Sequence, residues 1–332
     1  MRISFAAVPL LASVACATST ARSGDLGVDS GTTSHDSGAS HDAESNPEAD
    51  AGQQAVPDGE ASDVVTGGTG DTETGTGGTS CSSLPLCDNF DSDTPDMPPA
   101  GWTVAMGCNP QTTSNPSGMA DGPVPGGSGI YVGVDTSEHH SGNNSLRVVG
   151  GDSCGYYAVN TAAFTGSKLG PQYYARFWAM YSMAPTPTHN GFLSMNTTST
   201  ASHDPDLLRL GFQNNVIEWN WYGTDATLPD TDSQGAMQSV APTASTWACI
   251  EFHIDSTTGD IEFWYNGAST TTPGLSNSGT ASNGYNNAWI NGGWKAGISP
   301  TSLGLGWGSF NGAMMTVWFD DVALGNSRIG CD

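Results

Sequence analysis

The chain has 332 residues and carries 33 acidic side chains against eight Lys and Arg, a formal net charge of −25 at pH 7. This deficit of positive charge argues against nucleic acid as a partner, because phosphate recognition needs clustered Lys and Arg. All ten Trp and nearly all other aromatic residues follow residue 80, so only that part of the chain is able to bury a sizeable core.

The N-terminal residues 1–15 have the pattern of an export signal. Arg2 precedes an apolar run that ends at Leu11 and is too short to span a membrane as a helix. The next segment, Ser13-Val14-Ala15-Cys16, resembles a bacterial lipobox, in which the Cys is lipidated and becomes the mature N-terminus. We therefore expect an exported lipoprotein of the outer membrane or cell surface, lipidated at Cys16. A secreted protein with a plain signal peptide is the alternative.

Residues 16–80 form a segment of Ser, Thr, Gly, Ala, Asp and Glu that holds 12 of the 33 acids. Such a composition cannot bury enough apolar surface to offset chain entropy, so we expect a disordered tether that its own charge extends. Contact with a membrane is then expected only through the N-terminal lipid.

The remaining residues, 81–332, are expected to fold as one domain with disulfides. Apart from Cys16 the chain has six cysteines, and an even number in an exported protein indicates disulfide bonds. Cys81 or Cys87 at the start of the domain is able to join Cys331 at its end, since the termini of a sandwich often lie close. The spacing of the cysteines leaves the other pairings open. No Cys or His spacing in the chain is typical of a zinc site.

The segment 247–267, WACIEFHIDSTTGDIEFWYNG, shows the clearest local structure. Apolar residues alternate with polar ones on both sides of Ser256–Asp260, which predicts two half-buried strands and a short hairpin with one residue at positive φ. Two such strands cannot bury their apolar face alone, so a second sheet must cover them.

Other segments rich in aromatic and β-branched residues show similar patterns. In chain order the predicted strands are 86–90, 101–104, 145–149, 156–159, 173–181, 192–196, 207–213, 216–222, 303–307 and 314–324. Asn214-Asn215 predicts a tight hairpin, and no long helix is expected. The fold class predicted is all-β: a two-sheet antiparallel β-sandwich of the jelly-roll type, concanavalin- or laminin-G-like, and monomeric.

Three segments resemble a known superfamily: WACIEFHID…GDIEFWYNG, SGNNSLRV and the closing VWFDDVALGNSRIGC. They look like the concanavalin A-like jelly rolls, and most like the cellulose-induced secreted jelly-roll proteins and the related glucuronan lyases. This resemblance implies an extracellular domain that acts on or binds a polysaccharide.

The same resemblance implies one structural calcium ion that ties the first strand, a loop and the last strand together. The matching oxygen ligands are Asp88, Ser141, Asn144 and Asp320, and calcium takes six to eight such oxygens. The alternative is that the Asp side chains face solvent and the Asn residues form a turn.

A retaining glycosidase is disfavoured by the positions of the carboxylates. That chemistry needs two carboxylates on one strand face, as in the Glu-x-Asp-x-Glu strands of related enzymes. The domain has four Glu residues, and none lies in that pattern: Glu138, Glu218, Glu251 and Glu262.

A polyuronide lyase needs a group that neutralises the uronate carboxylate and a base that takes the α-proton. We expect Arg176 or Gln213 on the carboxylate and His189 or Tyr222 as the base, lining one concave groove; Arg209 shares a strand face with Gln213. Against a catalytic role, the domain has 21 acids and six bases, which repel a polyanion at low salt.

Non-catalytic carbohydrate binding is the alternative function. Trp178, Trp219 and Trp221 at alternating strand positions are candidates for a platform that stacks against sugar rings. A core position is the competing interpretation for each Trp, and a surface scaffold without a glycan ligand also fits the sequence.

Overall fold

The computed structural model describes residues 81–106, 131–151, 155–201, 206–229, 239–269, 275–277, 289, 293–310 and 313–331. They all belong to the unit Thr69–Asp332. The predicted export signal, Cys16, the acidic tether and the loop 109–129 lie outside the described residues, as do Cys108 and Cys154. Within the described ranges, no helix is long and apolar enough to cross a membrane.

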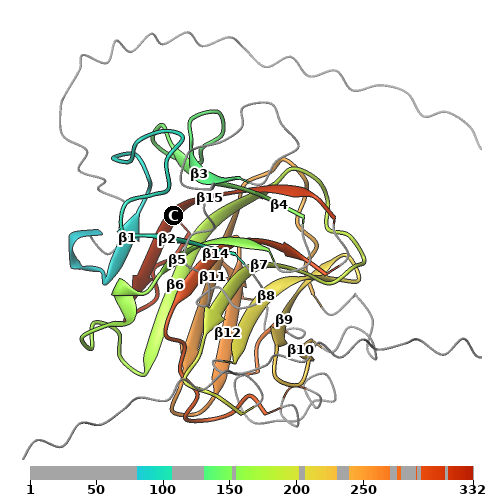
Figure 1. Cartoon of the computed structure of the whole chain (residues 1–332). Helices are drawn as coiled ribbons and strands as arrows, with labels where there is room; N and C mark the ends of the chain where they lie inside the picture. The colour runs from blue at the N-terminus through green and yellow to red at the C-terminus, as the bar shows by residue number, and fades with distance from the viewer. Residues whose placement is uncertain are drawn as a thin grey trace, which may run out of the picture. The chain divides into compact units, whose positions relative to one another are not determined.

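The strands form two antiparallel sheets (Figure 1). The eight-stranded sheet has the order β13 (Ala268–Ser269), β12 (Asp260–Tyr265), β11 (Ala248–Asp255), β6 (Gln172–Tyr181), β15 (Met315–Gly325), β4 (Ser145–Gly150), β3 (Tyr131–Asp135), and β1 (Leu86–Asp88) pairs with β15. The seven-stranded sheet has the order β10 (Ala226–Leu228), β9 (Val216–Trp221), β8 (Leu207–Gln213), β7 (Asn190–Asn196), β14 (Leu303–Ser309), β5 (Tyr156–Asn160), β2 (Thr103–Met106). Two short 3₁₀ turns, η1 (Cys81–Ser83) and η2 (Ala162–Phe164), complete the elements. The predicted all-β sandwich is confirmed.

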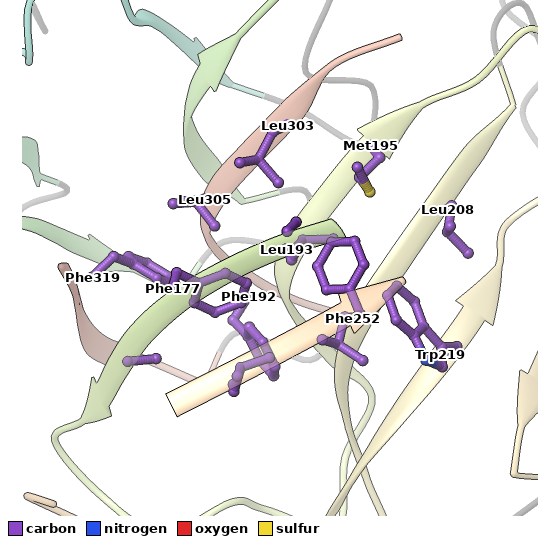
Figure 2. Close-up of a cluster of buried hydrophobic side chains, with 14 of the residues drawn as sticks. Phe177, Phe192, Leu193, Met195, Leu208, Trp219, Phe252, Leu303, Leu305 and Phe319 are labelled. Carbon is purple, nitrogen blue, oxygen red and sulfur yellow. The ribbon is translucent and has the colours of Figure 1, made fainter. Parts of the chain in front are cut away.

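A single apolar core fills the space between the two sheets (Figure 2). Phe177 of β6 and Phe252 of β11 enter it from the eight-stranded sheet, while Leu208 of β8 and Trp219 of β9 enter it from the seven-stranded sheet. The ring of Trp219 meets Phe252 edge to face, with centroids 5.2 Å apart. Aromatic pairs in this geometry stabilise a core beyond their buried area.

Both predicted hairpins have the expected backbone. Asn214 and Asn215 between β8 and β9 have φ of 51° and 68°, the positive values that a two-residue turn between twisted strands requires. Gly259 between β11 and β12 has φ of 83°, in the region that glycine enters without steric cost.

Three strands were not predicted. All five residues of β3 are buried, so its sequence YVGVD shows no alternation of exposed and buried positions. The loop around Met97 protects the free edge of β3, because Val134 N donates to Met97 O at 2.9 Å. The other two strands, β10 and β13, have three and two residues, which is too short for a periodic signal.

The disulfides differ from the expected pairing of the two termini. Cys81 bonds to Cys87, and Cys331 bonds to Cys249 of β11, so the expectation that Cys81 or Cys87 joins Cys331 is wrong. The reason is the position of the C-terminal segment, which lies on the outer face of the eight-stranded sheet beside Cys249. Disulfides indicate an oxidising, extracellular compartment.

Glu251 of β11 holds this C-terminal segment in place. Its side chain is fully buried on the outer face of the eight-stranded sheet. It accepts hydrogen bonds from the backbone N–H of Ile329 (2.8 Å) and Gly330 (3.1 Å) and from Nε of Arg328 (3.1 Å). A buried carboxylate is stable only with such partners, so Glu251 and residues 328–330 depend on each other.

Replacing Glu251 by Ala should therefore lower the free energy of unfolding by roughly 3 kcal/mol, because three hydrogen bonds to a buried carboxylate are lost. Chemical denaturation of the oxidised protein measures this change. The matched control is Glu262→Ala on the neighbouring strand, where the carboxylate is 36% exposed and lies 3.3 Å from His253. A surface pair of this kind contributes at most about 1 kcal/mol, and equal losses in the two variants would contradict the role of Glu251.

Candidate functional site

Over β7, β8 and β9, the outer face of the seven-stranded sheet carries polar side chains that are buried. Alternation along β7, β8 and β9 turns Ser194, Arg209 and Asn220 away from the core, and the strand register places them side by side. Their exposed fractions are 1%, 5% and 1%. Polar side chains on the outside of a sheet usually meet solvent, so this degree of burial distinguishes the row.

Several polar atoms on this face lack a hydrogen-bond partner among the described residues. They are Ser194 Oγ, both polar atoms of the Asn196 amide and Oδ1 of Asn220. A buried polar group without a partner is costly, and it is common at sites that bind a ligand. The face therefore has hydrogen-bonding capacity that the described part of the fold does not use.

Arg209 is the charged group at the centre of this face. Its guanidinium lies over the ring of Tyr222 at 4.0 Å and over the ring of Phe310 at 5.2 Å. Burial lowers the pKa of Arg209, while the nearby Tyr157, Tyr222 and Asp225 raise it. The side chain of Tyr222 also hydrogen-bonds to Arg209. Arg209 remains a cation at neutral pH, held between two aromatic rings.

Two more of the predicted site residues lie on this sheet. His189 directly precedes β7, and its ring lies 4.8 Å from that of Phe310, which follows β14. Gln213 ends β8 on the same face as Arg209, four residues farther along the strand. The structure thus brings His189 and Tyr222 around Arg209 and Phe310, with Gln213 at the end of the same strand.

Arg176 lies on the other sheet, so the expectation that it shares one groove with His189, Gln213 and Tyr222 is wrong. It faces outward from β6 in the eight-stranded sheet, between Glu251 of β11 and Ala323 of β15. Alternation shows which side chains share a face of one strand, but not the sheet to which that strand belongs.

The three predicted sugar-binding Trp residues do not form a platform. Trp219 and Trp221 point into the core, with exposed fractions of 0% and 2%. Trp178 lies on the outer face of the eight-stranded sheet, and the ring of His140 stacks on it at 3.6 Å. Trp219 and Trp221 lie in the core because the polar residues that alternate with them on β9 face outward.

The predicted calcium ligands lie on three segments that hydrogen bonds connect. The backbone N–H groups of His140 and Ser141 donate to Asp320 Oδ2 at 2.8 and 3.0 Å. Asn144 Nδ2 donates to Phe90 O at 3.1 Å, two residues after Asp88. Ser141 is thus beside Asp320, and Asn144 is beside the segment that follows β1.

Asp320 is the carboxylate that a cation would stabilise most. It is fully buried, and burial followed by the charge of Asp321 raises its pKa to about 7. Within the described part of the chain, no group of three or more His, Cys, Asp or Glu is arranged to hold a metal ion. Both carboxylate oxygens of Asp320 accept backbone N–H groups, Oδ2 from His140 and Ser141 and Oδ1 from Asp321. Calcium takes oxygen ligands, so its binding at Asp320 stays a prediction.

Three contributors to the site had no clear signal in the sequence. Phe310 follows β14 in a turn, where no periodic pattern predicts its direction. Ser194 and Asn220 occupy the polar positions of alternating strands, a pattern that ordinarily indicates solvent. Their burial depends on the tertiary structure.

Comparison with known proteins places the chain in one group. The family described as "Cip1-like, core domain", a polysaccharide lyase-like family, matches residues 120–327. Among solved structures, "Cellulose induced protein, Cip1" is similar with a TM-score of 0.59 and 26% identity, over 74% of this chain and 100% of that chain. No curated protein matches the sequence significantly.

Two further solved structures match the chain at lower similarity. One is an endo-β-1,4-glucuronan lyase from the fungus Trichoderma reesei, with a TM-score of 0.41 and 14% identity over 71% of this chain and 96% of that one. The other is the xylan-binding CBM22-1 domain of Paenibacillus barcinonensis Xyn10C, with a TM-score of 0.33 and 10% identity over 75% and 96%. Both are too distant to indicate function.

Proposed function

The chain belongs to the Cip1-like, polysaccharide lyase-like family, and from this premise we propose that it cleaves a uronate-containing polysaccharide on the outer face of its seven-stranded sheet. The observation that carries the proposal is Arg209. It is the one Lys or Arg among the residues of the described strands of that sheet. It lies over the rings of Tyr222 and Phe310, on the same face as polar groups that have no hydrogen-bond partner among the described residues. A fixed cation in such surroundings suits a carboxylate attached to a sugar ring.

The reaction proposed is a β-elimination. A base removes the proton on the carbon next to the carboxylate, and the electron pair of that C–H bond forms a carbon–carbon double bond. The glycosidic oxygen on the adjacent carbon leaves with the bonding electrons and takes up a proton. Negative charge builds on the uronate carboxylate as the proton is removed, and Arg209 stabilises that charge by direct contact.

Tyr222 is the base we assign. Its side chain contacts Arg209, so a sugar bound to Arg209 through its carboxylate brings the adjacent C–H bond towards Tyr222. Tyr157 lies near Arg209 as well, but its hydroxyl donates to Gly191 O, and burial raises its pKa to about 12, so the phenol stays protonated and is not available as a base. His189 and Arg209 both contact the ring of Phe310, and His189 is the second candidate for proton transfer. Gln213 is placed to hold the sugar chain rather than the reacting ring.

Replacing Arg209 by Gln should abolish the formation of unsaturated sugar ends, because the developing charge loses its partner. Removing one such electrostatic contact typically lowers kcat by about 10² to 10³-fold. The measurement is the ultraviolet absorbance of these ends with glucuronan, alginate and pectate. The matched control is Arg176→Gln on the opposite sheet, which should keep activity. Loss of activity in Arg176→Gln, with activity retained in Arg209→Gln, would move the site to the eight-stranded sheet.

No absorbance change with any polymer, together with retention of the wild type on an insoluble glycan, would make the domain a binding module.

Calcium is proposed as a structural ion held by Asp88, Ser141, Asn144 and Asp320. Its chemistry would be to neutralise the buried carboxylate of Asp320 and to join β1, the turn before β4, and β15. The elevated pKa of Asp320 supports this assignment, because a carboxylate that resists ionisation is one that a bound cation stabilises.

The pKa of Asp320 predicts a pH-dependent response to calcium. With a folded-state pKa of about 7 against an ordinary value of 3.8, the folded protein holds a proton that the unfolded chain has released between those pH values. Without metal, stability should therefore fall as pH rises from about 4 to about 7. Calcium should restore it above pH 7, by about 2.7 kcal/mol at a hundred times the dissociation constant. Thermal unfolding with calcium or a chelator at pH 5 and pH 8 measures this, and Asp320→Asn should remove both effects. Identical melting temperatures under all four conditions would refute the assignment.

The N-terminal segment is proposed to anchor the domain to the cell surface through a lipid on Cys16, with residues 16–80 as the tether. The lipobox-like sequence and the acidic composition support this arrangement. Cells that express the full chain should incorporate labelled fatty acid into the protein, and Cys16→Ser should lose the label and release the protein from the membrane fraction. Label that persists in Cys16→Ser would reject the anchor.

A further inference from the structure

Phe310 is the exposed aromatic residue of the described chain. Four large hydrophobic side chains are exposed among the described residues: Met97, Met183, Phe310 and Met314. Single apolar side chains on a surface are ordinary and by themselves carry no function. Phe310, which is 44% exposed, differs from the three Met residues in what it touches.

The ring of Phe310 joins two parts of the proposed site. The ring of His189 contacts the ring of Phe310, with centroids 4.8 Å apart and an angle of 31° between the ring planes. The guanidinium carbon of Arg209 lies 5.2 Å from the ring centre. An apolar surface thus lies directly beside the cation that we assign to the uronate carboxylate.

The backbone fixes Phe310 without help from its ring. Its N–H donates to His189 O at 3.2 Å. On the other side of the turn, Ala313 N donates to Ser309 Oγ at 3.0 Å, and Nε1 of the fully buried Trp307 donates to Ala313 O at 3.0 Å. The ring itself takes no part in these bonds, so the backbone of this turn can hold its position when the ring is replaced.

We propose that Phe310 is a stacking platform for the sugar ring next to the uronate that Arg209 binds. This inference rests on the proposed function and assigns a second subsite to it. The ligand class is a pyranose whose C–H face is free of axial hydroxyl groups, because such a face is apolar and packs on an aromatic ring. The 5.2 Å between ring and guanidinium allows one disaccharide to contact both.

A subsite at Phe310 predicts how binding depends on the number of sugars in the ligand. A single uronate reaches Arg209 alone, whereas a disaccharide reaches Arg209 and Phe310. Affinity should therefore rise from the monosaccharide to the disaccharide, and that increase should depend on Phe310. Because this contact forms with the bound substrate as well as in the transition state, it should affect KM rather than kcat.

The experiment compares the wild type with Phe310→Ala, Phe310→Trp and the control Met314→Ala, whose side chain is equally exposed at 44%. Calorimetric titration uses the mono- and disaccharides of glucuronate, mannuronate and galacturonate. Phe310→Ala should weaken disaccharide binding roughly three- to tenfold, the range of an aromatic contact, and leave monosaccharide binding unchanged. Phe310→Trp should retain the disaccharide affinity, Met314→Ala should match the wild type, and all three variants should melt as the wild type does.

The outcomes separate this inference from the proposed function. If the wild type binds a disaccharide and Phe310→Ala binds it equally well, the stacking subsite is refuted while the Arg209 site stands. If Phe310→Ala loses mono- and disaccharide affinity to the same extent, Phe310 only positions Arg209, and the subsite is again refuted. If the wild type binds none of the six sugars and cleaves no polyuronide, both the proposed function and the subsite fail.

Discussion

The apolar core between the two sheets depends on side chains at every second position of each strand. On β9, Trp219 and Trp221 enter the core, and the same alternation directs Glu218 and Asn220 to the outer face. A strand in such a sandwich therefore has two independent surfaces. One stabilises the fold by burying apolar area, and the other is available for chemistry without loss to the core.

The outer faces of the two sheets carry different kinds of side chains and interactions. On the eight-stranded sheet, Glu251 and the disulfide of Cys249 fix the C-terminal segment, and Asp320 lies beside the turn that precedes β4. Carboxylates there are used to join distant segments of the chain. On the seven-stranded sheet, Arg209 lies between aromatic rings beside polar groups without partners among the described residues. That face has the features of a binding surface.

Electrostatics limits what the proposed site is able to bind. The chain carries a net charge of −25, so a polyanionic substrate meets repulsion at long range. Among the described strands of the seven-stranded sheet, the positive charge that attracts it is Arg209. The attraction is strengthened locally because Arg209 is only 5% exposed and its surroundings are shielded from water. Apolar contact at Phe310 adds an interaction that does not depend on charge, which suits a polysaccharide whose sugars each have an apolar face.

Local sequence patterns determined most of the strands, the faces of those strands and the two tight turns, but not β3, β10 or β13. The ends of β8, the paired Asn residues after it and the outward direction of Arg209 all follow from alternation and turn chemistry. Only the tertiary structure decided which strands are neighbours. Arg176 and Arg209 have the same local pattern, yet strand pairing places them on opposite sheets. The same holds for the partner of Cys331 and the burial of Asp320, because periodicity records the two faces of one strand and contains no information on the residues that pack against them.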